Sequence, residues 1–273
     1  MRRGRRWVRR MRWIGVGHRK ALAGWIDTAP AEIDCLELTA EHFYDANDAV
    51  ERIARLGERY PLLVHGLGLS LGTPGPLDRQ RLAKFASVAR AADARWVSEH
   101  VAFTRVGSLD LGHLNPVSLG HDSLALLVDH AVEVAETCGK PLLLENITSH
   151  VRVGDGAAET DFLNALCDRA RCGLLLDVTN LVVNAHNHRF DASAWVRQLD
   201  PKHVVQLHIA GYRGGAGRRE DMHADGVQAD VLELTRTVLA TCNPRAIILE
   251  RDADFPSHED LVAELLTVRA ACA

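Results

Sequence analysis

Short apolar runs and longer amphipathic stretches alternate along this 273-residue chain, and the pair occurs eight times. The apolar runs are typical of buried β-strands, and the amphipathic stretches are typical of helices. An eight-fold β/α alternation predicts an α/β protein with the (β/α)8, or TIM-barrel, fold. The expected strands are residues 12–17, 33–39, 61–64, 95–98, 141–144, 173–178, 203–211 and 245–249. The expected helices are residues 47–59, 78–94, 121–138, 159–170, one that begins near residue 191, 227–241 and 257–271.

Three connections that follow expected strands are unusually long. A βα connection normally takes only ~2–6 residues, and a longer one often carries binding or catalytic groups. Residues 102–119 and 179–190 are therefore expected to be long loops, the first of them in contact with a substrate. Residues 211–226 are rich in glycine and charge, which indicates a mobile lid.

Six of the eight apolar runs end in a side chain that can bind a metal. In a TIM barrel the C-terminal ends of the strands converge on one mouth, where essentially all known active sites lie. Side chains that are far apart in the sequence therefore become neighbours at this mouth. The six residues are His65, His100, Glu145, Asp177, His208 and Glu250.

Three further donors follow these strands: Asn180 comes just after Asp177, and Asp221 and His223 share one loop. One metal takes at most about six ligands, so nine donors around one mouth predict two or three ions that share carboxylates. Carboxylates and neutral imidazoles are ligands of zinc, iron or manganese. The absence of cysteine from these positions argues against a structural zinc site or an Fe–S cluster.

Each of these residues, taken singly, also has a structural explanation. A lone Asp or Glu at a strand end is often a helix cap or an ion-pair partner, and a lone His is often a hydrogen-bonded core residue. That explanation fits the whole set poorly, because each unpaired buried charge costs several kcal/mol and six strands carry one at the same end. Further residues are candidates to contact a substrate or to support the metal ligands, namely Glu37, Glu41, His42, His113, His186 and His188.

Length and composition fit a single domain, since 273 residues at 47% hydrophobic match the roughly 250 residues typical of this barrel. We expect residues 12–273 to form the barrel and the strongly basic residues 1–11 to form a disordered arm. The net charge of −4 gives no sign of nucleic-acid binding. Six scattered cysteines without a CxxC pair indicate reduced thiols, and thus the cytoplasm. No apolar stretch reaches the ~18 residues that a membrane span requires.

Seven segments in fixed order resemble the multinuclear non-heme iron-dependent oxidases, a family that includes the oxidase of methanobactin biosynthesis. The segments are VHGLGLSLG, SEH, LLLENI, LLLDVTNLVVNAHNH, LHIAG, DMHAD and ILERD, and they span nearly the whole predicted barrel. The resemblance implies a TIM barrel with two or three iron ions at its mouth, in a mixture of Fe(II) and Fe(III). By motif, the first iron would be held by His65, His100 and a bridging Glu145, the second by Glu145, Asp177, His208 and Glu250, and the third by Asn180, Asp221 and His223.

The same resemblance implies an activity and partners. Members of this family oxidise a residue, most often a cysteine, of a ribosomally made precursor peptide, and they use O2 as the oxidant. Many of them need a separate partner protein that recognises the leader of the precursor peptide. We therefore expect a peptide substrate and a heteromeric complex, with no nucleic acid and no membrane among the partners.

Two other kinds of protein would carry similar residues. A hydrolase or isomerase of the xylose-isomerase or endonuclease IV kind also holds two or three zinc, manganese or magnesium ions at a barrel mouth. A DNA-repair enzyme of this kind needs a basic groove, whereas this chain is acidic beyond its first residues. A metal-storing or peptide-binding protein without activity predicts a closed, saturated site, whereas the long glycine-rich loops predict room for a substrate.

Overall fold

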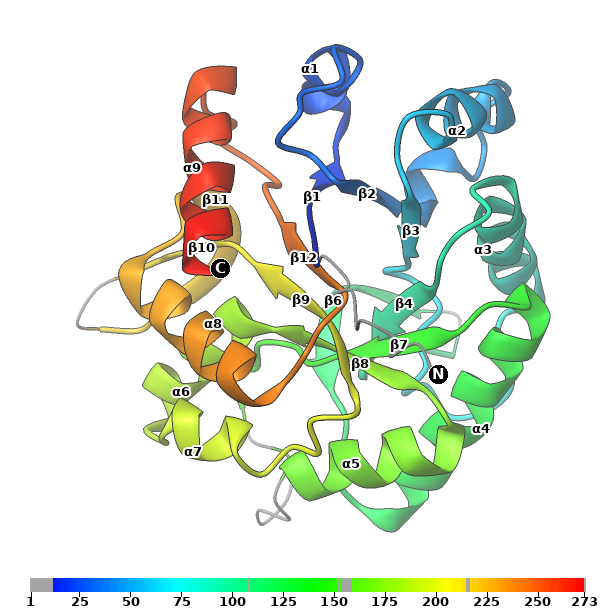
Figure 1. Cartoon of the computed structure of the whole chain (residues 1–273). Coiled ribbons are helices and arrows are strands. Elements are labelled where there is room, and N and C mark those ends of the chain that lie inside the picture. The colour runs from blue at the N-terminus through cyan, green and yellow to red at the C-terminus, as the bar shows by residue number, and fades with distance from the viewer. Residues whose placement is uncertain (1–11, 108, 152, 154–158, 215–216, 273) are drawn as a thin grey trace, which may run out of the picture.

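Eight parallel strands form a closed barrel, which confirms the predicted fold (Figure 1). They lie in the order β1-β12-β9-β8-β7-β4-β3-β2, and β2 pairs with β1 to close the ring. The computed structural model describes residues 12–107, 109–151, 153, 159–214 and 217–272, so the predicted basic arm of residues 1–11 lies outside the described residues. The barrel strands are β1 (Trp13–His18), β2 (Cys35–Thr39), β3 (Leu62–His65), β4 (Val97–His100), β7 (Leu142–Glu145), β8 (Gly173–Asp177), β9 (Val204–Ile209) and β12 (Ala246–Leu249).

Helices surround the barrel as a ring, from α1 at the top of Figure 1 clockwise to α9. Two predicted helix starts are confirmed by their caps. The carboxylate of Asp78 accepts hydrogen bonds from the backbone N–H groups of Gln80 and Arg81, and Asp191 caps the helix that follows it in the same way. The helices are α1 (Ala23–Ile26), α2 (Ala49–Gly57), α3 (Arg79–Ala91), α4 (His121–Cys138), α5 (Glu159–Ala170), α6 (Val178–His188), α7 (Ala192–Val196), α8 (Ala229–Thr241) and α9 (His258–Ala271), with 3-10 turns η1 (Lys20–Leu22) and η2 (Ala40–Phe43).

Successive residues of a strand point to opposite faces, so every second one points into the barrel, where apolar side chains lie below polar ones. The layer nearer the N-terminal strand ends is apolar, and in it the rings of Trp13 and Trp96 stack with centroids 6.0 Å apart. Residues two positions further along the strands form a polar layer that leads to the mouth. The apolar layer contains Cys35, Leu63, Trp96, Leu143, Leu175, Ala246 and Ile248, and the positions two residues later include Glu37, His65, Ser98, Glu145, Asp177 and Glu250.

The described parts of the three long connections contain strands or a helix, which their prediction as loops missed, whereas movement of residues 211–226 as a lid stays a prediction. Residues 102–119 contain the antiparallel hairpin of β5 (Ala102–Val106) and β6 (Leu109–Pro116). The described part of residues 211–226 contains a second hairpin, β10 (Gly211–Arg213) with β11 (Glu220–Asp225). In both segments the backbone groups pair with each other, which satisfies donors and acceptors that a loop would expose to water.

Residues 179–190 were also predicted as a loop, yet most of them belong to α6. The helix begins directly at the end of β8, because the side chain of Asp177 accepts a hydrogen bond of 2.7 Å from the backbone N–H of Asn180. Asp177 is thus both the last residue of a strand and the N-cap of a helix. A strand that passes into a helix without a connecting turn leaves none of the usual turn residues in the sequence.

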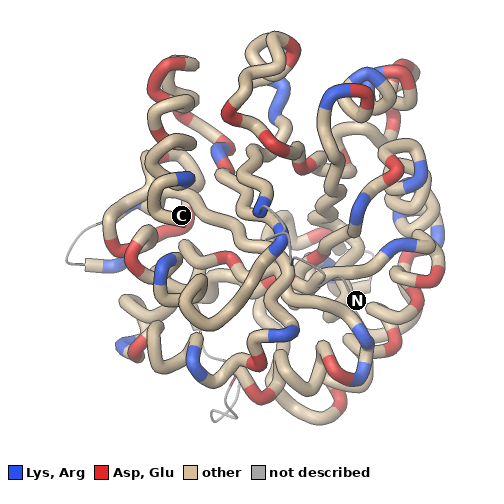
Figure 2. Tube along the Cα trace, viewed as in Figure 1, with Lys and Arg blue, Asp and Glu red and all other residues tan. Residues whose placement is uncertain are grey.

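The charged residues are distributed over the whole ring of helices. Lysine and arginine alternate with aspartate and glutamate around the ring of helices (Figure 2). Among the described residues, no helix combines the length and apolar character needed to cross a membrane. All six cysteines are free thiols.

Gly15 occupies the tightest position on β1. A Cβ atom at this residue would lie 2.3 Å from the carbonyl oxygen of Cys35 and 2.6 Å from its Sγ. The substitution Gly15→Ala must therefore move β1 against β2, and we expect it to lower the free energy of unfolding by roughly 1–3 kcal/mol. Urea unfolding curves of the wild type and the variant measure this difference.

Gly24→Ala is the matched control. A Cβ atom at Gly24 meets nothing within 4 Å among the described residues, and alanine favours the helix that contains it. This variant should be at least as stable as the wild type. Equal unfolding midpoints for the two variants would contradict the close contact between β1 and β2.

Candidate metal centre

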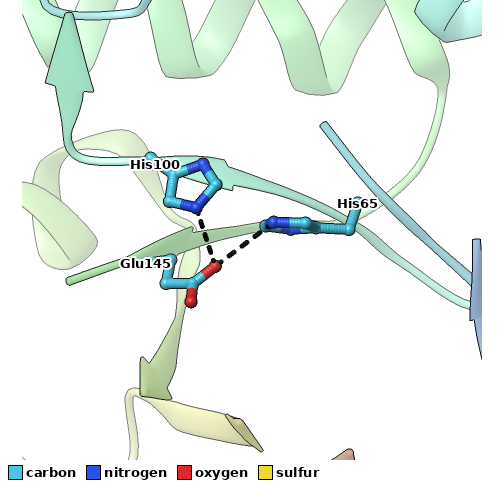
Figure 3. A group of neighbouring side chains, drawn as sticks. All are labelled: His65, His100 and Glu145. Atoms are coloured by element: carbon cyan, nitrogen blue, oxygen red, sulfur yellow. Dashed lines mark ion pairs between the residues drawn. The ribbon is translucent and has the colours of Figure 1, made fainter. Parts of the chain in front are cut away.

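The ends of three neighbouring strands bring together His65 from β3, His100 from β4 and Glu145 from β7 (Figure 3). The Oε2 atom of Glu145 lies 3.4 Å from Nε2 of His65 and 3.3 Å from Nε2 of His100. All three side chains are buried, and the two imidazole rings meet edge to face. We call these residues the first donor set, because one metal ion can lie between their three atoms.

A second donor set shares Glu145 with the first. It comprises Glu145, Asp177, His208 and Glu250, and one donor atom from each lies within 4.8 Å of every other. The Nδ1 atom of His208 is 3.1 Å from Oε1 of Glu145 and 3.2 Å from Oε2 of Glu250. Glu145 thus turns one carboxylate oxygen toward each set, which is the geometry of a carboxylate that bridges two ions.

A candidate third donor set lies beside the second and consists of buried polar atoms without a well-formed hydrogen bond. They are Oδ2 of Asp177, Oδ1 of Asn180, Oδ1 of Asp221 and Nε2 of His223. The Nε2 atom of His223 is 2.7 Å from the Asp221 oxygen and 3.7 Å from the Asp177 oxygen. Buried polar atoms without partners are rare in folded proteins, and a cation is the partner that carboxylate, amide and imidazole lone pairs share.

In Asp177 and Asn180, one side-chain polar atom makes a hydrogen bond and the other is left without one. Asp177 uses Oδ1 to cap α6, which leaves Oδ2 for the site. The side-chain amide of Asn180 donates a hydrogen bond of 3.2 Å to the carbonyl oxygen of Asn146, so its Oδ1 points away from that contact. These residues therefore form a cap and ion pairs and still leave lone pairs that could hold a metal.

Supporting residues select which nitrogen of each histidine faces the site. Ser98 Oγ lies 2.9 Å from Nδ1 of His65, which leaves Nε2 of that ring toward Glu145. Glu37 Oε1 lies 2.6 Å from Nε2 of His208, which leaves Nδ1 toward the second set. Partners of this kind fix the tautomer and orientation of metal-binding histidines. The interpretation of Glu37 as a supporting group agrees with this position.

The floor of the site is a hydrogen-bonded chain that the sequence did not predict. The indole N–H of Trp96 donates a 2.6 Å hydrogen bond to Oε1 of Gln206, and the amide of Gln206 donates in turn to Glu37. Glu99 lies beside the first set, with one oxygen on the backbone N–H of Leu69 and the other near His100. Gln206 lies two residues before His208 on the same strand, so alternation along the strand could have predicted that it points into the barrel. No comparable pattern in the sequence indicated Glu99.

Burial and neighbouring charge give the two imidazoles of the first set opposite properties. Burial, together with the rings of His100 and His208, holds the pKa of His65 well below its ordinary value. Burial also opposes a charge on His100, but the carboxylates of Glu145 and Glu99 outweigh it and raise the pKa of His100 to about 9. His65 is therefore a neutral donor, and His100 carries a proton that a bound cation would replace.

The second and third sets are coupled in the same way. Burial raises the pKa of Asp177 well above its ordinary value. Burial opposes ionisation of Glu250 too, yet the imidazoles of His208 and His223 lower the pKa of that carboxyl well below its ordinary range. In return, Glu250 and its neighbours overcome burial and raise the pKa of both imidazoles. So many buried carboxylates require positive charge nearby, from protons or from metal ions.

Four histidines that were candidates lie outside the donor sets. His42 is exposed in η2, and His113 is exposed on β6. His186 and His188 lie in the last turn of α6. His113, His186 and His188 each place a ring nitrogen against a backbone carbonyl oxygen. A contact with substrate stays a prediction for these four residues.

Glu41 lies near the mouth and holds the backbone that follows β3. Its Oε1 atom accepts hydrogen bonds of 3.0 Å from the backbone N–H groups of Leu67 and Gly68. Burial raises the pKa of Glu41. The residue therefore supports the chain just beyond His65.

Comparison with known proteins gives a family. A family model described as "RiPP precursor modification enzyme MbnB/TglH/ChrH" matches residues 13–273, where RiPP denotes a ribosomally synthesised and post-translationally modified peptide. The chain is 33% identical over 259 residues to a UPF0276 protein of Rhizorhabdus wittichii, which covers 94% of this chain and 93% of that protein. It is 35% identical over 266 residues to a UPF0276 protein of Bordetella pertussis, and the match covers 95% of this chain and 92% of that protein.

Solved structures with the same fold are much more distant in sequence. A D-psicose 3-epimerase solved in the presence of D-fructose has a TM-score of 0.62 at 15% identity, over 95% of this chain and 99% of that one. The TTHB071 protein of Thermus thermophilus, soaked with ZnCl2, has a TM-score of 0.57 at 16% identity, over 94% and 98%. At this level of identity, the likeness shows the barrel alone.

Binding of divalent metal should stabilise the protein, because it replaces repulsion among buried carboxylates with attraction. We expect Mn2+, or Fe2+ under nitrogen, to raise the free energy of unfolding of metal-stripped protein by about 2.7 kcal/mol per site at 100 times the dissociation constant, and with it the thermal midpoint. Differential scanning calorimetry measures the shift. Glu145→Ala should lose most of it, whereas Glu136→Ala, on the exposed face of α4, should retain it. A midpoint that does not respond to metal would argue against all three donor sets.

Proposed function

The chain belongs to the family of RiPP precursor modification enzymes MbnB/TglH/ChrH, and from this premise we propose that it is a multinuclear iron-dependent oxidase. Its substrate is a residue of a ribosomally made precursor peptide, most often a cysteine, and O2 is the oxidant. The support for iron comes from the donor atoms and from the resemblance of seven segments to such oxidases. Two or three ions lie at the mouth of the barrel, in a mixture of Fe(II) and Fe(III).

One observation carries this proposal, which is that the three donor sets share their carboxylates. Glu145 belongs to the first and second sets, and Asp177 belongs to the second and third. Shared carboxylates place ions close enough to exchange electrons and to act on one substrate. The donors are carboxylate, imidazole and amide groups, which suit non-heme iron, zinc and manganese.

Iron and the residues of the chain would have different roles in the reaction. Iron, when bound, supplies electron exchange with O2 and affinity for a thiolate. The protein holds His65 neutral and buried, fixes His208 through Glu37, and keeps water out with the apolar layer below. An oriented peptide side chain next to the donor sets would react as part of one assembled complex, which lowers the entropic barrier.

A peptide also suits the surface around the mouth. Leu67, Val106, Leu109 and Met222 are large apolar residues, and all four are exposed on segments that follow the mouth ends of barrel strands. Exposed apolar side chains on segments that follow the mouth ends of the strands could contact a peptide chain. We propose that the precursor peptide and a separate protein that recognises its leader dock here, in the cytoplasm. The free cysteines suit that compartment.

A zinc or manganese hydrolase or isomerase is the second candidate, because the same donors bind those metals. The D-psicose 3-epimerase and zinc-soaked neighbours share only the fold with this chain. Metal content separates the two functions. Protein purified without oxygen should contain two or more irons per chain with a coupled ferrous–ferric Mössbauer signal, whereas zinc or manganese retained after iron reconstitution would favour the hydrolase or isomerase.

The number of ions lost on substitution tests the shared carboxylate. Glu145→Ala should remove more than one iron per chain, because Glu145 contributes to two donor sets. Asn180→Ala should remove at most one, because Asn180 contributes only to the third set. Elemental analysis of protein reconstituted under nitrogen gives both values, and a loss of one iron or none from Glu145→Ala would contradict the bridging role.

The reaction itself is tested with a cysteine-containing precursor peptide encoded beside the gene. Iron-loaded protein, with its partner protein present, should change the mass of that peptide in air and leave it unchanged under nitrogen. A matched peptide with serine in place of cysteine is the control. Modification of the peptide without O2, or with zinc in place of iron, would refute the oxidase proposal.

A further inference from the structure

Asp252 lies two residues beyond β12 and contacts two hydrogen-bond donors at once. Its Oδ1 atom accepts a 2.6 Å hydrogen bond from Nε of Arg19, which follows β1. Its Oδ2 atom is 3.1 Å from Nδ1 of His223 on β11. The backbone N–H of Asp252 also donates a 2.8 Å hydrogen bond to the carbonyl oxygen of His223. One residue thus ties the second hairpin to the barrel.

These contacts determine which nitrogen of His223 is available to a metal. A neutral imidazole has one N–H, and the nitrogen that lacks the proton is the one that can bind a metal. With the proton on Nδ1, directed at Asp252, the lone pair is on Nε2. That Nε2 atom faces the carboxylates of Asp221, at 2.7 Å, and Asp177, at 3.7 Å.

We propose that Asp252 is a positioning residue for the third donor set, and that it acts by fixing the proton of His223 on Nδ1 so that Nε2 binds the metal. Arg19 holds the carboxylate of Asp252 in place for this purpose. The inference rests on the proposed function in one respect, since it requires a metal at the third set.

The backbone of His223 gives independent support. Its φ angle is +46°, in the left-handed region that residues other than glycine rarely adopt. Such a conformation costs of order 1–3 kcal/mol and persists only where surrounding contacts hold it. The hydrogen bond from Asp252 N–H to the carbonyl oxygen of His223 is such a contact. In this conformation the ring of His223 faces Asp177 and Asp221.

Glu250 is the other carboxylate near the same nitrogen, and it has a different task. Its Oε2 atom is 3.3 Å from Nδ1 of His223 but also 3.2 Å from Nδ1 of His208, within the second donor set. Arg19 contacts its other oxygen at 3.3 Å. With Oε2 engaged by a metal in the second set, Asp252 remains as the acceptor for the Nδ1 proton of His223.

The substitution Asp252→Asn keeps the shape of the side chain but favours the other tautomer of His223. Both groups that face Asp252 are donors, and a carboxylate accepts from both, whereas an amide accepts only through its oxygen. The charge-assisted bond to Arg19 is the stronger and keeps that oxygen. The amide NH2 then faces His223 Nδ1 and favours the tautomer with the proton on Nε2, which blocks the metal-binding nitrogen. The corresponding Asp-to-Asn change in serine proteases, which also selects the wrong histidine tautomer, is a precedent.

The experiment compares Asp252→Asn with Asp254→Asn. Asp254 lies two residues further along, contacts Arg213 on β10, and belongs to no donor set. Anaerobic titration of metal-stripped protein with Fe2+, followed by elemental analysis, counts the ions and ranks their affinities. Asp252→Asn should bind the third ion about 10–100 times more weakly, while the other two ions bind as tightly as in the wild type. Asp254→Asn should match the wild type.

The outcomes separate this inference from the proposed function. If the wild type and Asp252→Asn both bind three irons with equal affinity, the inference is overturned and the proposed oxidase function is unaffected. Two irons in the wild type would also overturn it, since no third ion would need His223. A wild type that binds no iron would refute both.

A second measurement does not depend on a variant. Nitrogen-15 NMR of the imidazole groups in zinc-loaded wild-type protein shows which nitrogen of His223 carries the proton. The proposal requires a proton on Nδ1 and coordination through Nε2. Coordination through Nδ1 would overturn it, even if Asp252→Asn failed to fold.

Discussion

The carboxylate of Glu145 is the group on which the rest of the site depends, because it is the contact between two donor sets. It faces the imidazoles of His65 and His100 with one oxygen and His208 with the other. A charge buried in this way would be very costly alone, and it is tolerated because positive groups surround it on both sides. The barrel creates the burial. An apolar layer fills the interior below the mouth, so the charges above it interact in a medium of low polarity and strongly shift the pKa values of one another.

The strand-end residues could be predicted because two rules of geometry act together. Parallel strands in a closed barrel bring their C-terminal ends to one mouth, and alternation along each strand decides which side chain points inward. Leu63 and His65 illustrate this, since the first belongs to the apolar layer and the second to the first donor set. Neither rule requires knowledge of the loops, and the sequence was therefore sufficient for the strands and for the placement of these six side chains at one mouth.

The sequence also singled out Asn180, Asp221 and His223 as donors, but their supporting contacts could not be predicted, since these join segments that are distant in sequence. The hairpin of β10 and β11 brings Asp221 and His223 over the mouth only because its own strands pair. Arg19 and Asp252 are 233 positions apart and meet because β1 and β12 are adjacent in the closed barrel. The start of α6 was missed for a different reason. Asp177 serves as cap and as donor at once, and one residue with two roles leaves a pattern that resembles a loop.

The three donor sets differ in how much support they need from the surrounding residues. The first two sets lie on barrel strands, whose backbone is fixed by parallel pairing on both sides. The third combines an uncharged amide, Asn180, with two residues from a hairpin, one of which has a strained backbone. The hairpin residues are not fixed by parallel pairing within the barrel, so the third set has the least rigid frame. Contacts from outside the set, through Asp252 and Arg19, therefore matter most at His223, where the frame is least rigid.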